Sequence, residues 1–253
     1  MPEISTAERA GVGNDGRPRP TEDRIVVLPN AVVVLDGATS PTPRERDGGW
    51  HSRALAAEFL AGGSRGLRGD LADELAGAID RLATGHGLAP GDSPSSTVAI
   101  VRWTGDSVDA LVLADSPVVV FGDPAVEVVS DDRLRDLRGR VDRVTDWRNR
   151  EGGFWVAEAD PAAAYRAVRR SWPRDAVHTA LIATDGVSCG VDEYGLFADW
   201  RSVLDITTGE GPEAVLDRIR AAEADDPDRV RWPRPKVHDD QALAVLRFRD
   251  ARR

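Results

Sequence analysis

The chain has 253 residues, a formal net charge of −10 at neutral pH and one cysteine, Cys189. Its hydrophobic fraction of 41% can supply a sizeable core, but no apolar run approaches the ~20 residues of a membrane-spanning helix. The acidic balance argues against a nucleic-acid-binding surface, and a single cysteine excludes an intrachain disulfide. The first residues lack the basic flank and apolar core of a secretory signal. We therefore expect a cytoplasmic protein with no nucleic-acid or membrane partner.

Residues 1–19 are polar, with glycine and proline towards their end, and we expect a flexible segment that precedes a core of about 20–248. The fragment 11–16 fits the Gly-x-Gly-x-x-Gly pattern of dinucleotide-binding loops. It lacks the preceding strand and the following helix that such a site requires, so a simple loop is the better interpretation. The rest of the chain shows no linker, and we expect a single domain over 1–253.

Short apolar runs and amphipathic segments follow one another along the core. Runs rich in valine and isoleucine predict strands, and apolar residues at three- and four-residue spacing predict helices. The predicted elements are strands 24–29 and 31–36, helices 52–60 and 70–82, strands 96–103, 107–114, 117–121 and 125–129, a charged excursion over 130–153, helix 161–172, strand 179–184, helix 212–223 and strand 241–248. Strands in runs joined by short turns favour an α+β fold with antiparallel sheets.

Acidic residues flank four of the predicted strands. The acidic pairs and Asp-Gly pairs are Glu22-Asp23, Asp36-Gly37, Asp185-Gly186 and Asp239-Asp240. One Asp-Gly pair is a common turn, but if the four strands are neighbours the carboxylates meet at one edge of a sheet. Two like charges about 4 Å apart repel by about 4 kcal/mol at an effective dielectric of 20. A hard divalent cation between the carboxylates turns this net repulsion into attraction, so the pattern predicts a binding site for Mg²⁺ or Mn²⁺.

Zinc is disfavoured because the four histidines are scattered, and we expect each of them at the surface. Two divalent ions about 3.5–4 Å apart can instead hold a bridging water as hydroxide and clamp phosphoryl oxygens for in-line attack. Asp36, Asp185 and Asp239 would then be catalytic through the metals they bind. A haloacid-dehalogenase-like phosphatase also ends an apolar strand with an acid, but it needs a second acid two residues later, where this chain has Ala38. Its parallel sheet also disagrees with the strand order.

The order of these motifs resembles the metal-dependent protein phosphatases of type 2C, in particular the bacterial serine/threonine-specific members. The six matching segments are TEDR (21–24), VLDGA (34–38), PSSTVAIV (94–101), LADSPVVVF (113–121), IATDGV (182–187) and HDDQALAVL (238–246). Their order and spacing agree with the family across residues ~20–248, which is nearly the whole chain. The resemblance implies a sandwich of two antiparallel β-sheets flanked by helices, with the metal ions at one end.

The resemblance also implies a set of metal ligands for two or three Mn²⁺ or Mg²⁺ ions. By position these would be Asp36, Gly37 through its carbonyl, Asp185, Asp239, Glu22, Asp23 and Asp115. Asp36 would bridge two ions, and Glu22 and Asp23 would hold metal-bound waters. Asp115 is either the ligand of a third ion or a turn residue.

The chain departs from the family pattern at several positions. The histidine that often follows Asp-Gly is missing, and Ala38 stands there, so that a metal-bound water or His51 would have to protonate the leaving oxygen. Ala114 replaces a glycine that is usual before the next acid. Arg19 and Arg17 both lie near the position of a phosphate-binding arginine, and guanidinium groups suit phosphate because they donate two parallel hydrogen bonds.

The resemblance implies a Mn/Mg-dependent hydrolase of phosphoserine or phosphothreonine in proteins. Two alternatives stay open: a phosphatase for a small phosphorylated metabolite, and a catalytically inactive type 2C-like domain that binds partners. The retained acids favour an enzyme, and the missing histidine favours an inactive domain. The charged stretch 133–150 falls where the family has a variable flap, and we expect it to be a solvated loop.

Overall fold

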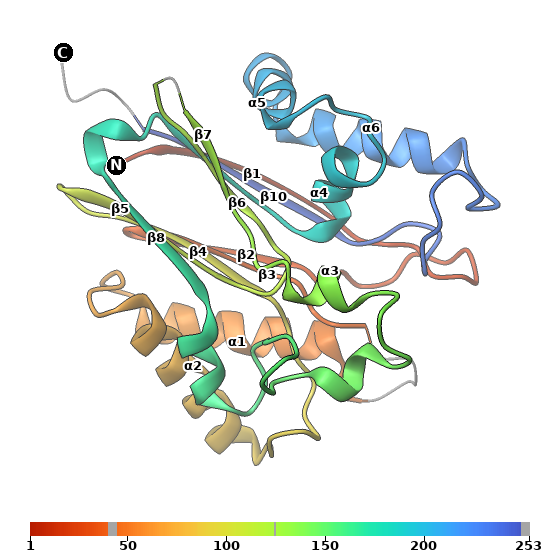
Figure 1. Cartoon of the computed structure of the whole chain (residues 1–253). Helices are drawn as coiled ribbons and strands as arrows, with labels where there is room; N and C mark the ends of the chain where they lie inside the picture. Colours follow the sequence, from red (N-terminus) through yellow and green to blue (C-terminus); the bar gives the residue numbers. More distant parts are fainter. Residues whose placement is uncertain (40–44, 124, 249–253) are drawn as a thin grey trace.

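Two five-stranded antiparallel sheets stack face to face in the computed structural model, which describes residues 1–39, 45–123 and 125–248 (Figure 1). The first sheet has the order β1 (Glu3–Arg9), β10 (Gln241–Arg247), β9 (Thr179–Ala183), β6 (Val118–Phe121) and β7 (Val126–Val129). The second has the order β2 (Arg24–Leu28), β3 (Ala31–Leu35), β4 (Val98–Trp103), β5 (Ser107–Leu113) and β8 (Val168–Pro173). The predicted α+β sandwich is confirmed.

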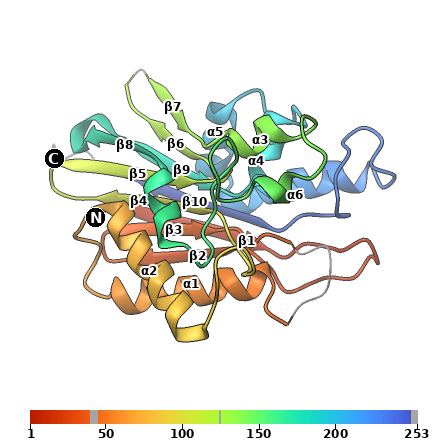
Figure 2. The same ribbon diagram turned by 60° about the horizontal axis from the view of Figure 1, so that its bottom comes forward.

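Helices cover the outer faces of both sheets. Figure 2 shows α1 (Gly48–Gly62) and α2 (Leu71–His86) across the second sheet, and Figure 1 shows α4 (Asp185–Asp192), α5 (Trp200–Gly209) and α6 (Pro212–Ala224) over the first. Shorter elements lie in the connections: α3 (Arg133–Leu137), η1 (Val144–Trp147), η2 (Pro161–Arg166) and η3 (Arg174–Ala176). Among the described residues no helix is both long and apolar enough to cross a bilayer.

Because each sheet is covered on both faces, its central strands are apolar without alternation. All five residues of β3 are buried. Val32 and Val34 point into the core between the sheets, where they meet residues such as Ile182, whereas Val33 and Leu35 pack under α1 and α2. The continuous apolar runs in the sequence therefore come from burial on two sides.

Side-chain caps begin the two helices under the second sheet. The Asp47 carboxylate accepts a hydrogen bond from the Trp50 amide, and that of Asp70 accepts one from the Ala72 amide. Gly87 ends α2 in the left-handed conformation at φ 62°, where glycine has no steric penalty. Between the predicted strand 31–36 and the predicted helix 52–60 the sequence indicates a loop over 38–50, and residues 40–44 of this loop lie outside the described part of the chain.

The expectation of a flexible segment over 1–19 is wrong for residues 3–9. They form β1, which pairs with the whole of β10 from Glu3↔Arg247 to Arg9↔Gln241. Ala7 is 5% exposed and packs into the core of the first sheet. The backbone groups along the edge of β10 need hydrogen-bond partners, and β1 supplies them in spite of its polar composition.

The predicted helix over 161–172 is also wrong. The Asp160 carboxylate caps the first turn as expected, by accepting from the Ala162 amide, but only the short helix η2 follows. Residues 168–173 then form β8, which pairs antiparallel with β5 from Val112↔Val168 to Ser107↔Pro173. Strand pairing with β5 outweighs the helix propensity of this segment, as tertiary context often does.

Short connections between strands do not always join neighbours in one sheet. The turns after β4 and after β6 join antiparallel neighbours, as predicted. In contrast, β5 and β6 are separated only by residues 114–117 yet belong to different sheets. This connection therefore carries Asp115 across the end of the sandwich instead of closing a hairpin.

The role of β1 can be tested by charging its buried face. We expect Ala7→Asp to lower the free energy of unfolding by about 2 kcal/mol or more, because an unpaired carboxylate would be buried against the first sheet. Thr6→Asp, on the exposed neighbouring position of the same strand, should change it little. Thermal unfolding of both variants measures this, and equal stability of the two would contradict the placement of β1.

Candidate functional site

The four acidic segments converge at one end of the sandwich, although they do not share one sheet. In the second sheet the start of β2 faces the end of β3, with Arg24 opposite Leu35. In the first sheet the start of β10 faces the end of β9, with Leu243 opposite Ala183. The expectation of a single sheet edge is therefore corrected: two strand pairs, one from each sheet, bring their acids together between the sheets.

Thr184 joins these two strand pairs. Its hydroxyl donates to the Asp23 Oδ2 atom at 2.7 Å and accepts from the Ala242 amide at 2.9 Å. Asp23 is 0% exposed, and its other oxygen, Oδ1, has no hydrogen-bond partner within the described residues. A buried carboxylate oxygen without a donor is costly unless a cation or ordered water lies beside it.

Asp36 and Gly37 are held where β3 ends. The Asp36 amide donates to Thr97 Oγ1, and the Gly37 amide donates to the Glu22 carbonyl at 3.2 Å. A side chain at Gly37 would collide with the carbonyl of Gly48, the first residue of α1. Glycine is therefore required here by the close approach of two backbones.

Asp185 is the first residue of α4, a helix that was not among the predicted elements. A side chain at Gly186 would collide with the Asp240 carbonyl, so α4 begins directly against the start of β10. Gln241 Nε2 donates to the Gly186 carbonyl at 3.1 Å and fixes that contact. Asp185 and Asp239 thus lie on facing segments.

The electrostatic environment of these carboxylates disfavours their charged forms. Burial, followed by repulsion from Asp239, raises the pKa of Asp185 to about 7. Burial raises the pKa of Asp36 well above its ordinary value, and the charges of Asp23 and Asp185 add to this. The pKa of Asp23 is likewise raised, chiefly by burial. Three acids without enough positive charge nearby make this end of the sandwich a site that favours cations.

One cation from the chain already lies among the acids. Lys236 Nζ donates to Asp239 Oδ1 at 2.6 Å, Asp240 Oδ2 at 3.1 Å and Glu22 Oε2 at 3.2 Å. Burial by itself would lower the pKa of Lys236, but the carboxylates of Asp239 and Asp240 outweigh it and raise the pKa. No local sequence pattern indicates this contact, apart from Lys236 being the one lysine of the chain.

The donor set fits hard divalent cations. Its atoms are carboxylate and carbonyl oxygens, the ligands that Mg²⁺ and Mn²⁺ prefer. The unpartnered Asp23 oxygen and the ammonium group beside Asp239 both indicate where positive charge is favoured. Across residues 1–39, 45–123 and 125–248, no three His, Cys, Asp or Glu side chains are already arranged as a shell around one ion. Side chains would therefore have to rearrange when a metal binds.

Asp115 lies at the same end, in the connection from β5 to β6. Arg138 of the charged excursion donates to it at 3.3 Å. Ala114 keeps the left-handed backbone at φ 69° that the usual glycine would adopt, and its amide donates to the buried Asp131 carboxylate at 3.2 Å. For a residue with a side chain this conformation costs about 1–2 kcal/mol. The turn that presents Asp115 is thus preserved despite the substitution.

The charged excursion is not simply a solvated loop, because it packs on the site. Leu134, Leu137 and Val144 lie against a small buried cluster of Ala114, Phe154 and Val156. Arg148 pairs with the buried Glu158 at 3.1 Å. These contacts anchor both ends of the segment that carries Arg138.

His51 is wrongly predicted as a surface residue. It is 0% exposed on α1, and its Nδ1 atom lies 3.1 Å from Ser96 Oγ. Burial, and secondarily the positive charge of Arg148, lowers the pKa of His51 to about 4. A neutral imidazole does not supply a proton at neutral pH, so this residue does not replace the missing histidine. His86 and His178 are exposed as expected, whereas His238 is half-buried and contacts Glu223 Oε2 at 2.7 Å.

The two candidate phosphate-binding arginines lie on the loop between β1 and β2, which runs beside the start of β10. Val12 pairs with both Pro18 and His238 across this loop. Arg17 and Arg19 are both exposed. The guanidinium of Arg19 lies over Gly13, where a side chain would collide with it, whereas the Arg17 amide is tied to Asp15 at the loop's tip.

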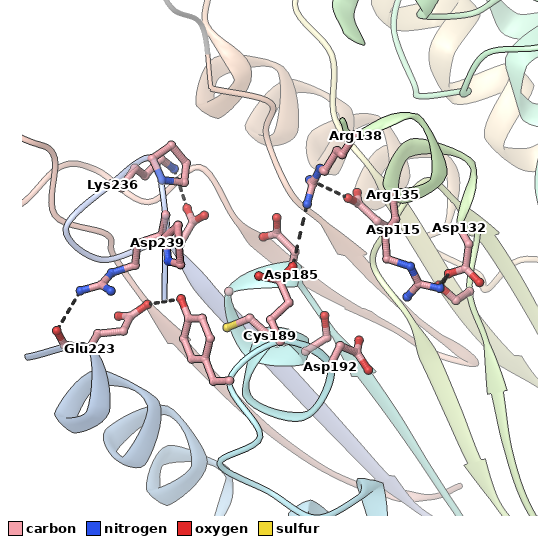
Figure 3. Close-up of a pocket in the computed structure, with 18 residues that line it drawn as sticks. Asp115, Asp132, Arg135, Arg138, Asp185, Cys189, Asp192, Glu223, Lys236 and Asp239 are labelled. Carbon is pink, nitrogen blue, oxygen red and sulfur yellow. Dashed lines mark hydrogen bonds and ion pairs between the residues drawn. The ribbon is translucent and has the colours of Figure 1, made fainter. Parts of the chain in front are cut away.

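A pocket of about 380 Å³ opens beside the acids (Figure 3). Asp185, Asp239 and Lys236 form one part of its wall, and Asp115 and Arg138 form another. Figure 3 shows Lys236 pointing toward Asp239, and Arg138 toward Asp115. The pocket gives the clustered carboxylates access to solvent and to a ligand.

The sequence matches the family model described as Protein phosphatase 2C over residues 19–219. No curated protein matches the chain in sequence. The fold is similar to serine/threonine phosphatase Stp1 from Staphylococcus aureus, with a TM-score of 0.63 and 14% identity over 98% of this chain and 96% of that one. It is also similar to the Mycobacterium tuberculosis serine/threonine phosphatase PstP/Ppp, with a TM-score of 0.60 and 14% identity over 98% and 99% of the chains.

A further similar structure is the catalytic domain of the serine/threonine phosphatase PstP, solved in complex with two manganese ions. It has a TM-score of 0.58 and 14% identity, and the alignment covers 98% of this chain and 99% of that one. At such low identities these structures show the shared fold alone. The match to the family model, which covers more than half of the chain, shows the family.

The charge imbalance at the site predicts that Asp36→Asn stabilises the metal-free protein. A carboxyl group whose pKa is raised by folding destabilises the fold when it is ionised at neutral pH, and asparagine removes that charge. In EDTA we expect the melting temperature to rise by a few degrees, the change that about 1 kcal/mol produces in a domain of this size.

Asp109→Asn provides the opposite control. Burial alone would raise the pKa of Asp109, but hydrogen bonds from Ser171 and Arg102 outweigh it and lower the pKa. Its ionised form therefore stabilises the fold, and the substitution should lower the melting temperature. An Asp36→Asn variant that melts at or below the wild-type temperature in EDTA would contradict the charge imbalance.

Proposed function

The chain belongs to the protein phosphatase 2C family, and from this premise we propose that it is a metal-dependent phosphomonoester hydrolase that acts on phosphoserine and phosphothreonine in proteins. The observation that supports this most strongly is the convergence of buried, incompletely neutralised carboxylates at one end of the sandwich. A fold bears such repulsion only where another requirement outweighs it. Metal binding is the requirement that fits the donor atoms.

We assign the divalent ions to the oxygens that the sequence motifs bring together. Asp36 and the Gly37 carbonyl lie at the end of β3, and Asp185 and Asp239 face them from the first sheet. Glu22, Asp23 and Asp115 surround this set, the first two as holders of water and the third for an additional ion. When bound, Mn²⁺ or Mg²⁺ ions supply an activated water nucleophile and positive charge for the phosphoryl oxygens.

Other residues hold these metal ligands in position. Thr97 and the Gly48 backbone hold Asp36 and Gly37 in place, and Thr184 holds Asp23. We assign phosphate binding to Arg19 in preference to Arg17, because the Arg19 amide donates to the Gly11 carbonyl and the Gly11 amide donates to Asp240 beside the start of β10. We assign His51 no role as a proton donor, because burial lowers its pKa to about 4.

The pocket beside the acids favours a substrate larger than phosphate itself. Arg135 and Arg138 of the charged excursion line it opposite Lys236, and exposed arginines suit a phosphorylated protein segment. A small phosphorylated metabolite is the alternative substrate, since the acids recognise mainly the phosphoryl group. Comparing phosphopeptide with small phosphomonoesters by kcat/KM separates the two.

One observation favours the second candidate function, a catalytically inactive domain that binds partners. Lys236 already neutralises part of the acidic cluster, through Glu22 and Asp239. Metal-dependent hydrolysis distinguishes the enzyme from the inactive domain directly.

We expect hydrolysis of p-nitrophenyl phosphate that requires Mn²⁺ or Mg²⁺ and is abolished by EDTA. Asp239→Asn and Asp36→Ala should each lower kcat/KM by about 10²-fold or more, the loss typical when an electrostatic stabiliser of a transition state is removed. Asp217→Asn, which removes an exposed partner of Arg9, should retain activity. Folded wild-type protein that is inactive with both metals would support the binding domain instead.

The proposed phosphate contact of Arg19 predicts that substitutions of Arg19 and Arg17 affect KM differently. Arg19→Gln should raise KM by about tenfold, because a hydrogen bond to a charged group contributes about 1.5 kcal/mol or more. Arg17→Gln removes the same charge from the tip of the same loop and should leave KM nearly unchanged. Steady-state kinetics of the pair measures this, and an equal rise in both variants would indicate a general charge effect instead of a phosphate contact.

A further inference from the structure

Lys236 is the one lysine in a chain whose other basic residues are arginines and four histidines. It follows Pro235 in the segment that leads into β10, three residues before Asp239. Its ammonium group contacts three carboxylates, one of them on Glu22, which is 214 residues away in the chain. A lysine presents a compact point charge, in contrast to the planar fork of arginine, and so resembles a bound metal ion more closely.

The segment that carries Lys236 is anchored firmly. Arg234 pairs with Asp226 at 3.1 Å and also donates to the Glu223 carbonyl at 2.8 Å. Asp226 in turn accepts from the Trp232 amide at 3.0 Å. The backbone beside Lys236 is therefore fixed, and the freedom of its ammonium group lies in the side chain.

The contacts of the ammonium group also link the two sheets. Glu22 precedes β2 in the second sheet, whereas Asp239 and Asp240 precede β10 in the first. Lys236 thus joins the same two strand ends between which the metal ligands converge. Its contacts use oxygens of Glu22 and Asp239, two residues that the proposed metal site also requires.

We propose that Lys236 is a tethered cation that competes with a divalent ion for Glu22 and Asp239, and that its ammonium group must leave these carboxylates before that ion binds. This inference rests on the proposed metal site. The space to receive the displaced side chain exists, because Lys236 lines the 380 Å³ pocket together with the acidic residues Asp192 and Glu223. In the absence of metal the lysine lowers the repulsion among the acids, and it thereby weakens metal affinity.

The test is calorimetric titration of the full chain with Mn²⁺ alone. Lys236→Met, which keeps the length of the side chain and removes its charge, should bind Mn²⁺ about tenfold more tightly or take up one more ion, as expected when a competing charge is removed. Lys236→Arg keeps the charge and should stay near wild type. Arg218→Met removes a positive charge from an exposed pair with Glu210 and controls for net charge.

Thermal unfolding with and without Mn²⁺ provides a second test. In EDTA, Lys236→Met should melt below the wild type, because its acids have lost their cation. Addition of Mn²⁺ should then raise its melting temperature by more than that of the wild type, since stabilisation follows ligand affinity. The Arg218→Met variant should show the wild-type increment.

Mn²⁺ affinity and ion count in Lys236→Met that equal or fall below those of the wild type would overturn the inference, as would the absence of binding in every variant. Wild-type protein that binds Mn²⁺ but hydrolyses no phosphomonoester contradicts the proposed function only. The inference about Lys236 is then tested by the Mn²⁺ titration alone, because the measured affinity does not depend on phosphatase activity.

Discussion

Carboxylates buried at one end of the sandwich repel one another, and the other features of this site depend on that repulsion. Asp23, Asp36 and Asp185 all have raised pKa values, chiefly through burial. In a low dielectric such repulsion amounts to several kcal/mol unless cations lie between the charges. The fold keeps these acids together through backbone contacts that leave little freedom, such as the approach of Gly37 to Gly48. The backbone that carries the acids is therefore in place before a metal is bound, and Lys236 supplies part of the missing positive charge.

The antiparallel register is what turns four separate motifs into one site. Pairing of β2 with β3 and of β9 with β10 places the residues that flank these strands at the same end of both sheets. The connection from β5 to β6 crosses between the sheets at that end and adds Asp115. Thr184 and Lys236 then link the two strand pairs by hydrogen bonds. A rigid backbone scaffold of this kind lowers the entropic cost of binding.

Sequence patterns predicted the strands buried on both faces, such as β3 and β10, because their apolar runs are local and continuous. They also predicted the acidic set, since each acid directly follows or precedes such a run. Pairing was harder to predict: β1 is polar and forms only against the exposed edge of β10, and β8 forms against β5 where local propensity favours a helix. The burial of His51 and the contact of Lys236 with Glu22 depend on tertiary packing over long separations, which leave no local signal.

The most direct test of the central claim is the position of Mn²⁺ in crystals of the wild-type protein, located by its anomalous scattering. We expect peaks at the end of the sandwich, within bonding distance of Asp36 and Asp239 oxygens, with the Lys236 ammonium group displaced into the pocket. Peaks confined to surface carboxylates, with the contacts of Lys236 to Glu22 and Asp239 unchanged at saturating Mn²⁺, would contradict a metal centre at this position.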